Sequence, residues 1–340
     1  MEQISTCRAA YLIPFIEVLR ELGAPVEGEL ARAKLPVLLE EIPDERISNV
    51  LAGQFAERCK HREGVDDLGW LAAKRYSTST FSEDLLTVLR FSPTVKSRLD
   101  RFANLAALES SEVRVGIAQS GASVEVFCDY TVPDDLTGLS NFDWTQAMVL
   151  VEIVRSVMGE TWCPNAFNFQ SRFSVCDDAR QAYPNTAFIN GAKHTSITFP
   201  SIVLSKCAAS CLPSSSLEMF EAPRKFVLDP YGQVLRPYLR EGTPKLELLA
   251  EIMGTSPRSL QRILQKEGFS YSQLLEKTRF ELAVEMLQES DNPLIEIALD
   301  LGYENQSNFS RSFKRISGTS PGAYRRQMLE QGQFAKSGAI

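Results

Sequence analysis

The chain has 340 residues, of which 44% are hydrophobic and 23% are charged, and both fractions are close to those of an average globular protein. This length is sufficient for two or more domains that each bury a hydrophobic core. The formal net charge is −7, which excludes a chain that is basic throughout and on its face argues against DNA binding.

Residues 1–110 show the apolar spacing of three and four residues that is typical of helices packed on a core. Leu12, Phe15, Ile16 and Leu19 form one such stripe, and we interpret it as a set of core contacts. Helices are predicted over residues 11–23, 47–59, 68–76, 85–91 and 95–108.

The period then changes to the alternation that is typical of strands. Residues 112–119 and 122–130 alternate polar and apolar side chains and are joined across Ser120 and Gly121, which predicts a β-hairpin. Further short strands are predicted at 165–169, 187–189 and 196–199. The N-terminal domain is therefore expected to be α+β, with helices around a small mixed sheet.

Residues 142–159 are apolar nearly all round, interrupted by Glu152 and Arg155. A membrane span is not expected, because the uninterrupted apolar run is far below the ~20 residues that a spanning helix needs. A buried helix and a dimerisation helix both remain open for this segment.

Aromatic side chains gather in the middle of the chain, where they could line a pocket for a small molecule. An equally simple interpretation is that they form the core. His194 could be a polar pocket group or a surface residue. The candidate pocket residues are Phe127, Tyr130, Trp144, Trp162, Phe169 and His194.

Seven cysteines are scattered and odd in number, and no cleavable leader is recognisable before them. Reduced thiols in a cytoplasmic protein are the natural interpretation. Cys207 and Cys211 could sense redox state or bind a metal, but the chain has only two histidines. We therefore expect no metal site.

Pro213 and the three serines 214–216 indicate a linker. We place a first domain at 1–210, the linker at 211–225, a second domain at 226–329 and a disordered tail at 330–340. A helix from about 231 to 240 is expected to open the second domain.

Two passages in this second domain, 248–268 and 296–318, have the same residue pattern and are interpreted as two copies of one structural motif. Each contains an alanine followed four residues later by a glycine: Ala250 with Gly254, and Ala298 with Gly302. The alanine allows close helix packing, and the glycine suits a left-handed helix cap. A second helix then follows in each passage, with an expected buried face of Leu260, Ile263 and Leu264 in one and Phe309, Phe313 and Ile316 in the other.

The opposite face of each second helix carries hydrogen-bond donors and acceptors rather than acids. Ser256, followed by Pro257, and Asn305 are the expected N-caps. Helix, tight turn and helix with such side chains is the helix-turn-helix arrangement, in which the second helix reads the major groove. Two ordinary helical hairpins facing water are the alternative.

Residues 271–290 lie between the two units and predict a helix of about 30 Å. This is close to one turn of B-DNA, about 34 Å, so the helix could hold the two reading helices in successive major grooves. Its apolar stripe is Leu274, Leu275, Phe280, Leu282, Ala283, Met286 and Leu287. Residues 245–329 contain 11 basic and 11 acidic residues, so this segment is neutral and most of the excess acid lies upstream.

Residues 246–326 resemble the DNA-binding domain of the AraC/XylS family of transcription regulators. The matching motifs are SPRSLQR, IALDLGYENQSNFSRSFKR and GTSPGAYR, which place the helix-turn-helix units at about 246–267 and 294–317. By this resemblance base contacts fall on Arg258, Ser259, Gln261, Arg262, Gln306, Ser307, Asn308 and Arg311. Phosphate contacts are expected at Lys266, Lys314 and Arg315. The second helix begins with short side chains, which leaves open whether it contacts bases or only phosphates.

The N-terminal layout resembles the arabinose-binding-like effector-binding and dimerisation domain of one branch of this family. The resemblance implies an activator that binds promoter DNA, contacts RNA polymerase, responds to a small-molecule effector and could form a homodimer. A DNA-binding protein whose N-terminal half only dimerises remains an alternative, and a fused metabolic enzyme is a further one. Residues 318–322 match the G-x-S-x-G pattern of a nucleophile elbow. A nucleophile elbow needs a strand before its serine, but a helix is expected before Ser320. We expect no catalytic residue and no cofactor.

Overall fold

The computed structural model describes residues 4–130, 139–208, 230–289 and 291–328. The chain divides into two compact units, residues 1–223 and 224–340, which are described separately below. The predicted linker at 211–225 and tail at 330–340 lie outside the described residues.

The N-terminal unit begins with short strands and helices that were only partly predicted. Its first elements are β1 (Thr6–Arg8), α1 (Ile13–Glu21), α2 (Val26–Arg32), β2 (Arg46–Ser48), α3 (Asn49–Glu63), α4 (Leu68–Ala73), α5 (Glu83–Arg90) and α6 (Val95–Glu109). The five predicted helices are confirmed as α1, α3, α4, α5 and α6. Ser48 caps α3, and Thr94 forms a capping box with Ser97 at the start of α6. The antiparallel pair β1 and β2 was missed, because three residues are too few to show a period.

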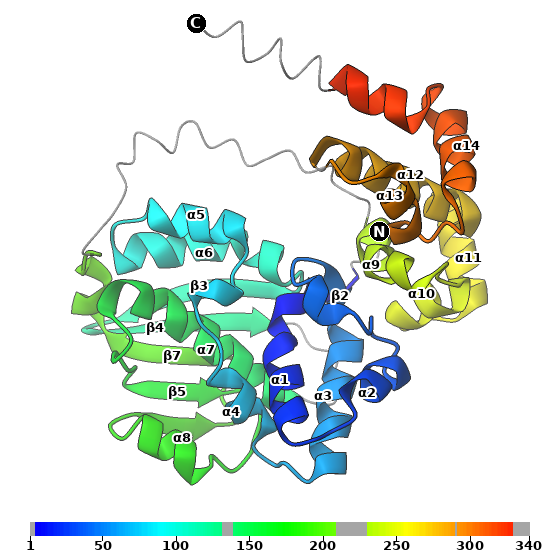
Figure 1. Cartoon of the computed structure of the whole chain (residues 1–340). Coiled ribbons are helices and arrows are strands. Elements are labelled where there is room, and N and C mark those ends of the chain that lie inside the picture. Colours follow the sequence, from blue (N-terminus) through cyan, green and yellow to red (C-terminus); the bar gives the residue numbers. More distant parts are fainter. Residues whose placement is uncertain (1–3, 131–138, 209–229, 290, 329–340) are drawn as a thin grey trace, which may run out of the picture. The chain divides into compact units, whose positions relative to one another are not determined.

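A five-stranded mixed sheet forms the centre of the unit (Figure 1). Its strands are β3 (Val113–Ser120), β4 (Ser123–Tyr130), β5 (Ala166–Phe169), β6 (Ala187–Asn190) and β7 (Thr195–Pro200), in the order β3-β4-β7-β5-β6. β5 and β6 are parallel and the other pairs antiparallel, so the predicted mixed sheet is confirmed. The hairpin turn is Gly121 and Ala122, one residue later than predicted, because Ser120 still pairs with Ser123.

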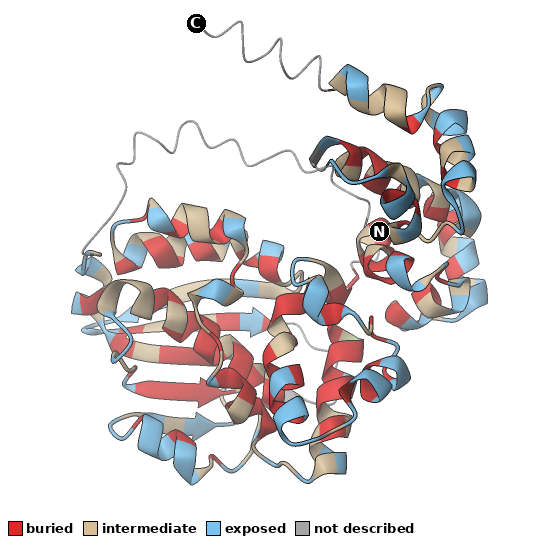
Figure 2. Cartoon of the chain, viewed as in Figure 1, coloured by how far each residue is buried: buried red, intermediate tan, exposed pale blue. Residues whose placement is uncertain are grey.

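Helix α7 (Leu139–Met158) is the predicted long apolar helix, and it packs on β5, β7, α4 and α6. Ala147, Leu150 and Val154 are fully buried, as Figure 2 shows for much of this helix. Asp143 ties it to the sheet region, since its carboxylate accepts hydrogen bonds from the Ser171 amide (2.9 Å) and the Thr195 hydroxyl. Within the described residues, no helix is long and apolar enough to cross a membrane. The helix is buried within the unit, and a role in dimerisation stays a prediction.

The C-terminal unit is all helical. It contains α9 (Pro230–Leu235), a 3-10 helix (Arg236–Glu241), α10 (Leu246–Ile252), α11 (Pro257–Lys266), α12 (Tyr271–Glu289), α13 (Leu294–Asp300) and α14 (Gln306–Ser317), and residues 321–328 are also helical. The predicted opening helix at about 231–240 is present, with its second half in the tighter 3-10 form. Two helix-turn-helix units joined by a long helix are confirmed.

The long helix α12 is more central than predicted. Thr278 and Val284 are buried in addition to most of the predicted stripe, whereas Phe280 and Met286 are only partly buried. The reason is that α9, the 3-10 helix and α14 all pack against α12, so it is covered on more than one side. The buried position predicted for Ile316 is wrong, because its side chain is 42% exposed. Tyr324 from the following helix packs on Phe313 in its place.

Candidate functional site

The first helix-turn-helix unit consists of α10 and α11. Ala250 is buried between the helices, and Gly254 ends α10 in the left-handed region with φ +61°. The Ser256 hydroxyl caps α11 by accepting a hydrogen bond from the Ser259 amide at 3.1 Å. Leu260 and Leu264 are buried on one face of α11, so its opposite face is directed to solvent.

The second unit, α13 and α14, repeats this geometry. Ala298 is fully buried, and Gly302 has φ +71°. The Asn305 side chain caps α14 by accepting a hydrogen bond from the Asn308 amide at 2.9 Å. Phe309 and Phe313 hold the inner face of α14 on the core.

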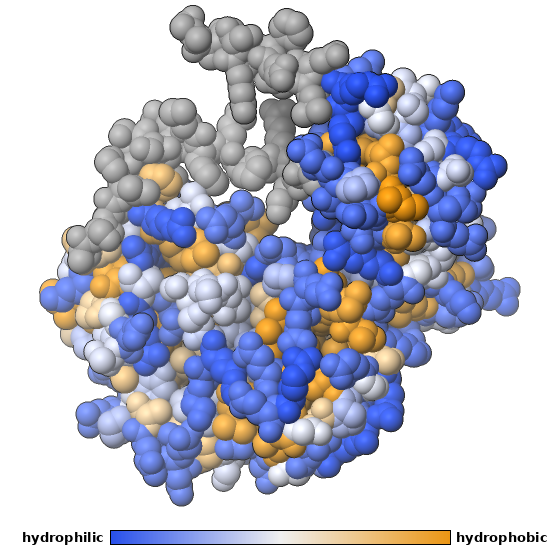
Figure 3. All heavy atoms as spheres, in the orientation of Figure 1, coloured by the Kyte–Doolittle hydropathy of each residue, from blue (hydrophilic) through white to orange (hydrophobic). Residues whose placement is uncertain are grey.

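Both second helices lie along one edge of the unit in Figure 1, and that edge is mostly hydrophilic in Figure 3. The connecting helix α12 has 19 residues, so its length is about 28 Å. This is compatible with one helical turn of B-DNA, about 34 Å.

Arg279 on α12 holds the second unit in place, and the sequence analysis did not identify it. Its guanidinium donates to the carbonyl oxygens of Leu301 (2.9 Å) and Gly302 (3.2 Å) and to the Thr243 hydroxyl (2.7 Å). A cation at this position satisfies carbonyl groups at the end of α13, where the helix dipole is negative. Burial lowers the pKa of Arg279 from its usual range. No sequence signal marks this contact, because it joins residues more than twenty positions apart.

The candidate residues on α11 are available for contact. Arg258, Gln261, Arg262 and Lys266 are exposed and form no ion pair or hydrogen bond through their side chains within the described part of the chain. Ser259 is partly buried, and its hydroxyl accepts a hydrogen bond from the Ser256 hydroxyl at 3.0 Å.

Some of the candidate residues on α14 already have hydrogen-bond or ion-pair partners within the unit. Arg311 donates to the Asn308 side-chain oxygen at 2.6 Å, and Arg315 forms an ion pair with Glu276 of α12. Gln306, Ser307 and Lys314 are exposed. The two reading helices therefore share a fold but differ in how many of their polar groups already have a partner.

The acids of α12 do not all point away from the reading helices. Glu285 accepts two hydrogen bonds from Arg236, at 2.6 and 3.0 Å. Glu276, in contrast, lies against Arg315 and Ser312 of α14. An open groove in the same unit is lined by residues of both signs, including Lys245, Glu276, Arg279 and Arg315.

The nucleophile-elbow string at 318–322 is a junction between two helices. Gly318 ends α14 with φ +79°, and the Ser320 hydroxyl accepts a hydrogen bond from the Ala323 amide at 3.3 Å. Ser320 is thus a helix cap, and the strand that an elbow requires does not precede it. The six described cysteines are free, and Cys211 lies outside the described residues. No cluster of three or more metal-binding side chains occurs among the residues that the structure describes.

The candidate effector residues do not line one common pocket. Phe127 and Tyr130 are three positions apart on β4, so they lie on opposite faces of the sheet. Phe127 packs over Gly116 of β3 and stacks on His194 with ring centres 5.0 Å apart. His194 itself lies 3.5 Å from the Asp129 carboxylate.

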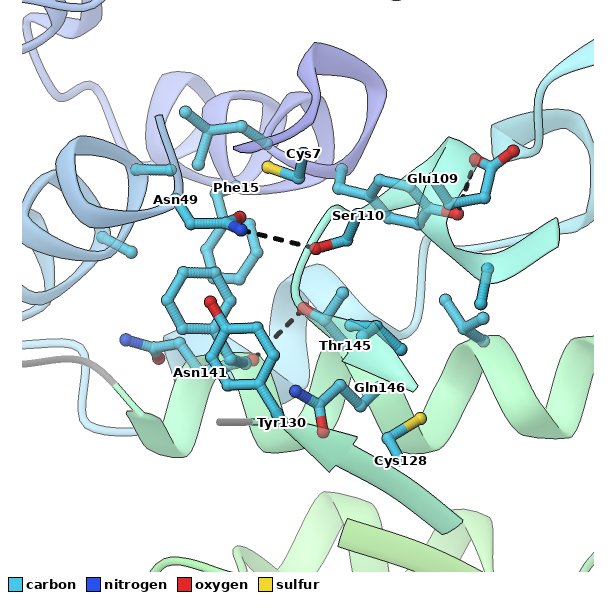
Figure 4. A pocket seen from close by; sticks show the side chains of 18 of the residues that line it. Cys7, Phe15, Asn49, Glu109, Ser110, Cys128, Tyr130, Asn141, Thr145 and Gln146 are labelled. Carbon is cyan, nitrogen blue, oxygen red and sulfur yellow. Dashed lines mark hydrogen bonds between the residues drawn. The ribbon is translucent and has the colours of Figure 1, made fainter. Parts of the chain in front are cut away.

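The other aromatic candidates belong to the core. Trp144 and Phe169 are buried with ring centres 4.7 Å apart, and Trp162 packs edge-on against Phe199. A cavity lies elsewhere in the unit, between α1, α3, α6, α7 and β4, and of the six candidates only Tyr130 lines it (Figure 4).

The geometry of the C-terminal unit defines a tandem helix-turn-helix domain, the class that transcription regulators use to bind DNA. Residues 249–327 match the protein family described as "Helix-turn-helix domain". The C-terminal unit is a helix-turn-helix domain of the AraC/XylS type.

The chain is similar to the ornithine utilization regulator of Pseudomonas aeruginosa, with 44% identity over 82 residues, which cover 24% of each chain. It is 37% identical over 90 residues to the transcriptional regulator VirS of Mycobacterium tuberculosis, which cover 26% of each chain. Both matches therefore span about a quarter of the relative's length. Among solved structures, the transcriptional regulator CdpR of P. aeruginosa aligns over 92% of this chain and 98% of its own, with 19% identity and a TM-score of 0.39.

Proposed function

We propose that this protein is a sequence-specific transcription regulator that binds double-stranded promoter DNA through α11 and α14. The observation that carries the proposal is the pair of capped, exposed polar helices on one edge of the unit, joined by a helix whose length is close to a turn of the duplex. The family of the C-terminal unit supports the same class of function.

Within this proposal Arg258, Ser259, Gln261 and Arg262 contact bases from α11. Gln306, Ser307, Asn308 and Arg311 do so from α14. Arg can bind guanine with two hydrogen bonds, and Gln or Asn can bind adenine in the same way. Lys266, Lys314 and Arg315 neutralise phosphates.

The N-terminal unit binds a small-molecule effector and a second copy of the chain in this proposal. Effector binding shifts the equilibrium between different arrangements of the DNA-binding unit. The DNA-bound form recruits RNA polymerase, so that the protein acts as an activator in the cytoplasm. A molecule can shift this equilibrium only by its difference in affinity for the two states.

Selection of bound sequences from random DNA by the full-length protein tests the function. We expect a site with two contacted segments about one helical turn apart, and a duplicated site if the protein binds as a dimer. Recovery of unrelated sequences, or of a single short segment, would contradict the tandem use of α11 and α14.

A further inference from the structure

The cavity of the N-terminal unit lies between four helices and residues of β1, β3 and β4 (Figure 4). It offers about 70 Å³ to the centres of water-sized molecules, which is room for several such molecules. Its wall is almost entirely apolar, with contributions from Phe15, Ala52, Ala56, Phe102 and Val149. A concave, mostly apolar space with a few polar groups is typical of a small-molecule site.

Helix α7 supplies the polar part of one wall. Asn141, Thr145, Gln146 and Val149 line the cavity from a single face of this helix. The Oε1 atom of Gln146 is buried and has no hydrogen-bond partner among the described residues. A buried acceptor without a partner is unfavourable, so a donor brought by a bound molecule would relieve this cost. The last side-chain torsion of Gln is soft, so the amide can turn its oxygen toward such a donor.

Other polar groups at the cavity already have partners. Asn49 donates to the hydroxyls of Ser5 (3.2 Å) and Ser110 (3.3 Å), and the latter bond is drawn in Figure 4. The Thr145 hydroxyl donates to the Asn141 carbonyl at 3.2 Å. Gln146 is therefore the side chain that a bound molecule would engage most directly.

The charge at the cavity is balanced. Among the described residues that line the cavity, Glu109 is the one that carries a charge. Its carboxylate accepts hydrogen bonds from Arg8 and from the Tyr11 hydroxyl, both at 2.9 Å, and from the Ser82 hydroxyl. Burial raises the pKa of the Cys7 and Cys128 thiols to about 12, so both are neutral at pH 7.

An ionised molecule would therefore be poorly accommodated. Among the described lining residues an anion would find no cation to pair with, and a cation would find the Glu109 oxygens already bonded. We infer that the cavity takes a small uncharged molecule with an apolar body and one hydroxyl or amide donor, which bonds to Gln146. Its assignment as the effector site rests on the proposed function, but its ligand chemistry does not.

Calorimetric titration of the full-length protein without DNA tests this inference with four compounds that share one body: benzyl alcohol, toluene, benzoate and benzylammonium. We expect benzyl alcohol to bind about tenfold more tightly than toluene, which corresponds to one hydrogen bond. Benzoate and benzylammonium should give no binding at millimolar concentration. Equal affinity for benzyl alcohol and toluene, comparable binding of an ion, or no binding of benzyl alcohol would overturn the inference.

Two variants test whether these compounds bind in this cavity. Gln146→Leu should remove the preference for benzyl alcohol over toluene and retain toluene binding, whereas Gln54→Leu, at an exposed position on α3, should change neither. Ala52→Leu, which fills the cavity, should abolish the binding of both compounds, with circular dichroism confirming the fold. An unchanged preference in Gln146→Leu would refute the assigned contact. If DNA selection fails while the titrations give the expected results, only the proposed function is contradicted.

Discussion

The two helix-turn-helix units have the same fold but different surroundings. Gly254 of the first unit has open space beside it, whereas a Cβ on Gly302 of the second would lie 2.6 Å from the Leu239 carbonyl oxygen. The cations of α11 have no partner within the described residues, but Arg311 and Arg315 of α14 do. Gly302 and the arginines of the second unit therefore have closer neighbours in their own domain, and under the proposed function Arg311 and Arg315 exchange these partners for DNA.

The largest expected difference concerns the two glycines. Gly302→Ala should destabilise the C-terminal unit by about 2–5 kcal/mol, from the left-handed backbone and from overpacking against Leu239 and Gly242. Gly254→Ala meets only the backbone penalty, about 1–2 kcal/mol. Differential scanning calorimetry of the full-length variants measures both. Gly318→Ala, with open space and φ +79°, is the matched control and should behave like Gly254→Ala; equal losses at Gly254 and Gly302 would show that the contact is unimportant.

The next largest effect separates the arginines of the two reading helices. Arg262→Ala should weaken specific DNA binding by about 1–3 kcal/mol and relax discrimination at one base position. Arg311→Ala should cost less, because Arg311 must first give up its bond to Asn308, worth about 0.5–1.5 kcal/mol. Competition binding with single-base variants of the selected site measures both quantities. A larger loss of affinity for Arg311→Ala than for Arg262→Ala would contradict the expectation that the arginine of α11 contributes more to specific binding than the arginine of α14.

A smaller effect is expected for the two lysines. Lys266→Ala and Lys314→Ala should each reduce the slope of log affinity against log salt concentration by about one, with little change in base preference. Fluorescence anisotropy over a salt series gives the slopes. Arg20→Ala, in an exposed ion pair of the N-terminal unit, is the control and should leave the slope unchanged. A flat salt dependence in the unmodified protein would contradict phosphate contact altogether.

The smallest expected change follows from the Glu276 ion pair. Glu276→Gln releases Arg315 and removes a negative charge beside α14, so DNA binding should tighten by under about 1 kcal/mol. The gain should shrink as salt concentration rises. Weaker binding in this variant would mean that Glu276 serves to position Arg315 for the phosphate backbone.

The helical period, the caps and the repeated alanine and glycine predicted the C-terminal fold well. Local signals were sufficient there because the caps at Ser256 and Asn305 and the left-handed backbone at Gly254 and Gly302 involve residues only a few positions apart. Arg279 and Glu276 could not be found in this way, since their partners are 20 to 40 positions away. Ile316 has the correct spacing for burial, but no helical period indicates which neighbour covers a position.

The N-terminal prediction succeeded for strands and helices but not for the assembly of a pocket. Composition alone grouped Phe127 with Tyr130, although the alternation of β4 already separates them. The cavity is lined by residues of β1, α1, α3, α6, β3, β4 and α7. The lining combines small or weakly polar residues such as Ala52 and Gln146 with large ones such as Phe15 and Phe102. Nothing in the local sequence marks these residues as neighbours.

The contact between Gly302 and the carbonyls of Leu239 and Gly242 has a practical consequence for truncation. The region matched by the family begins at residue 249, after α9 and the 3-10 helix. Tyr231, Leu235 and Leu239 in that preceding segment are almost completely buried. A minimal fragment trimmed to the recognisable repeat would therefore lack part of its own interior, and one intended to fold should start no later than Pro230.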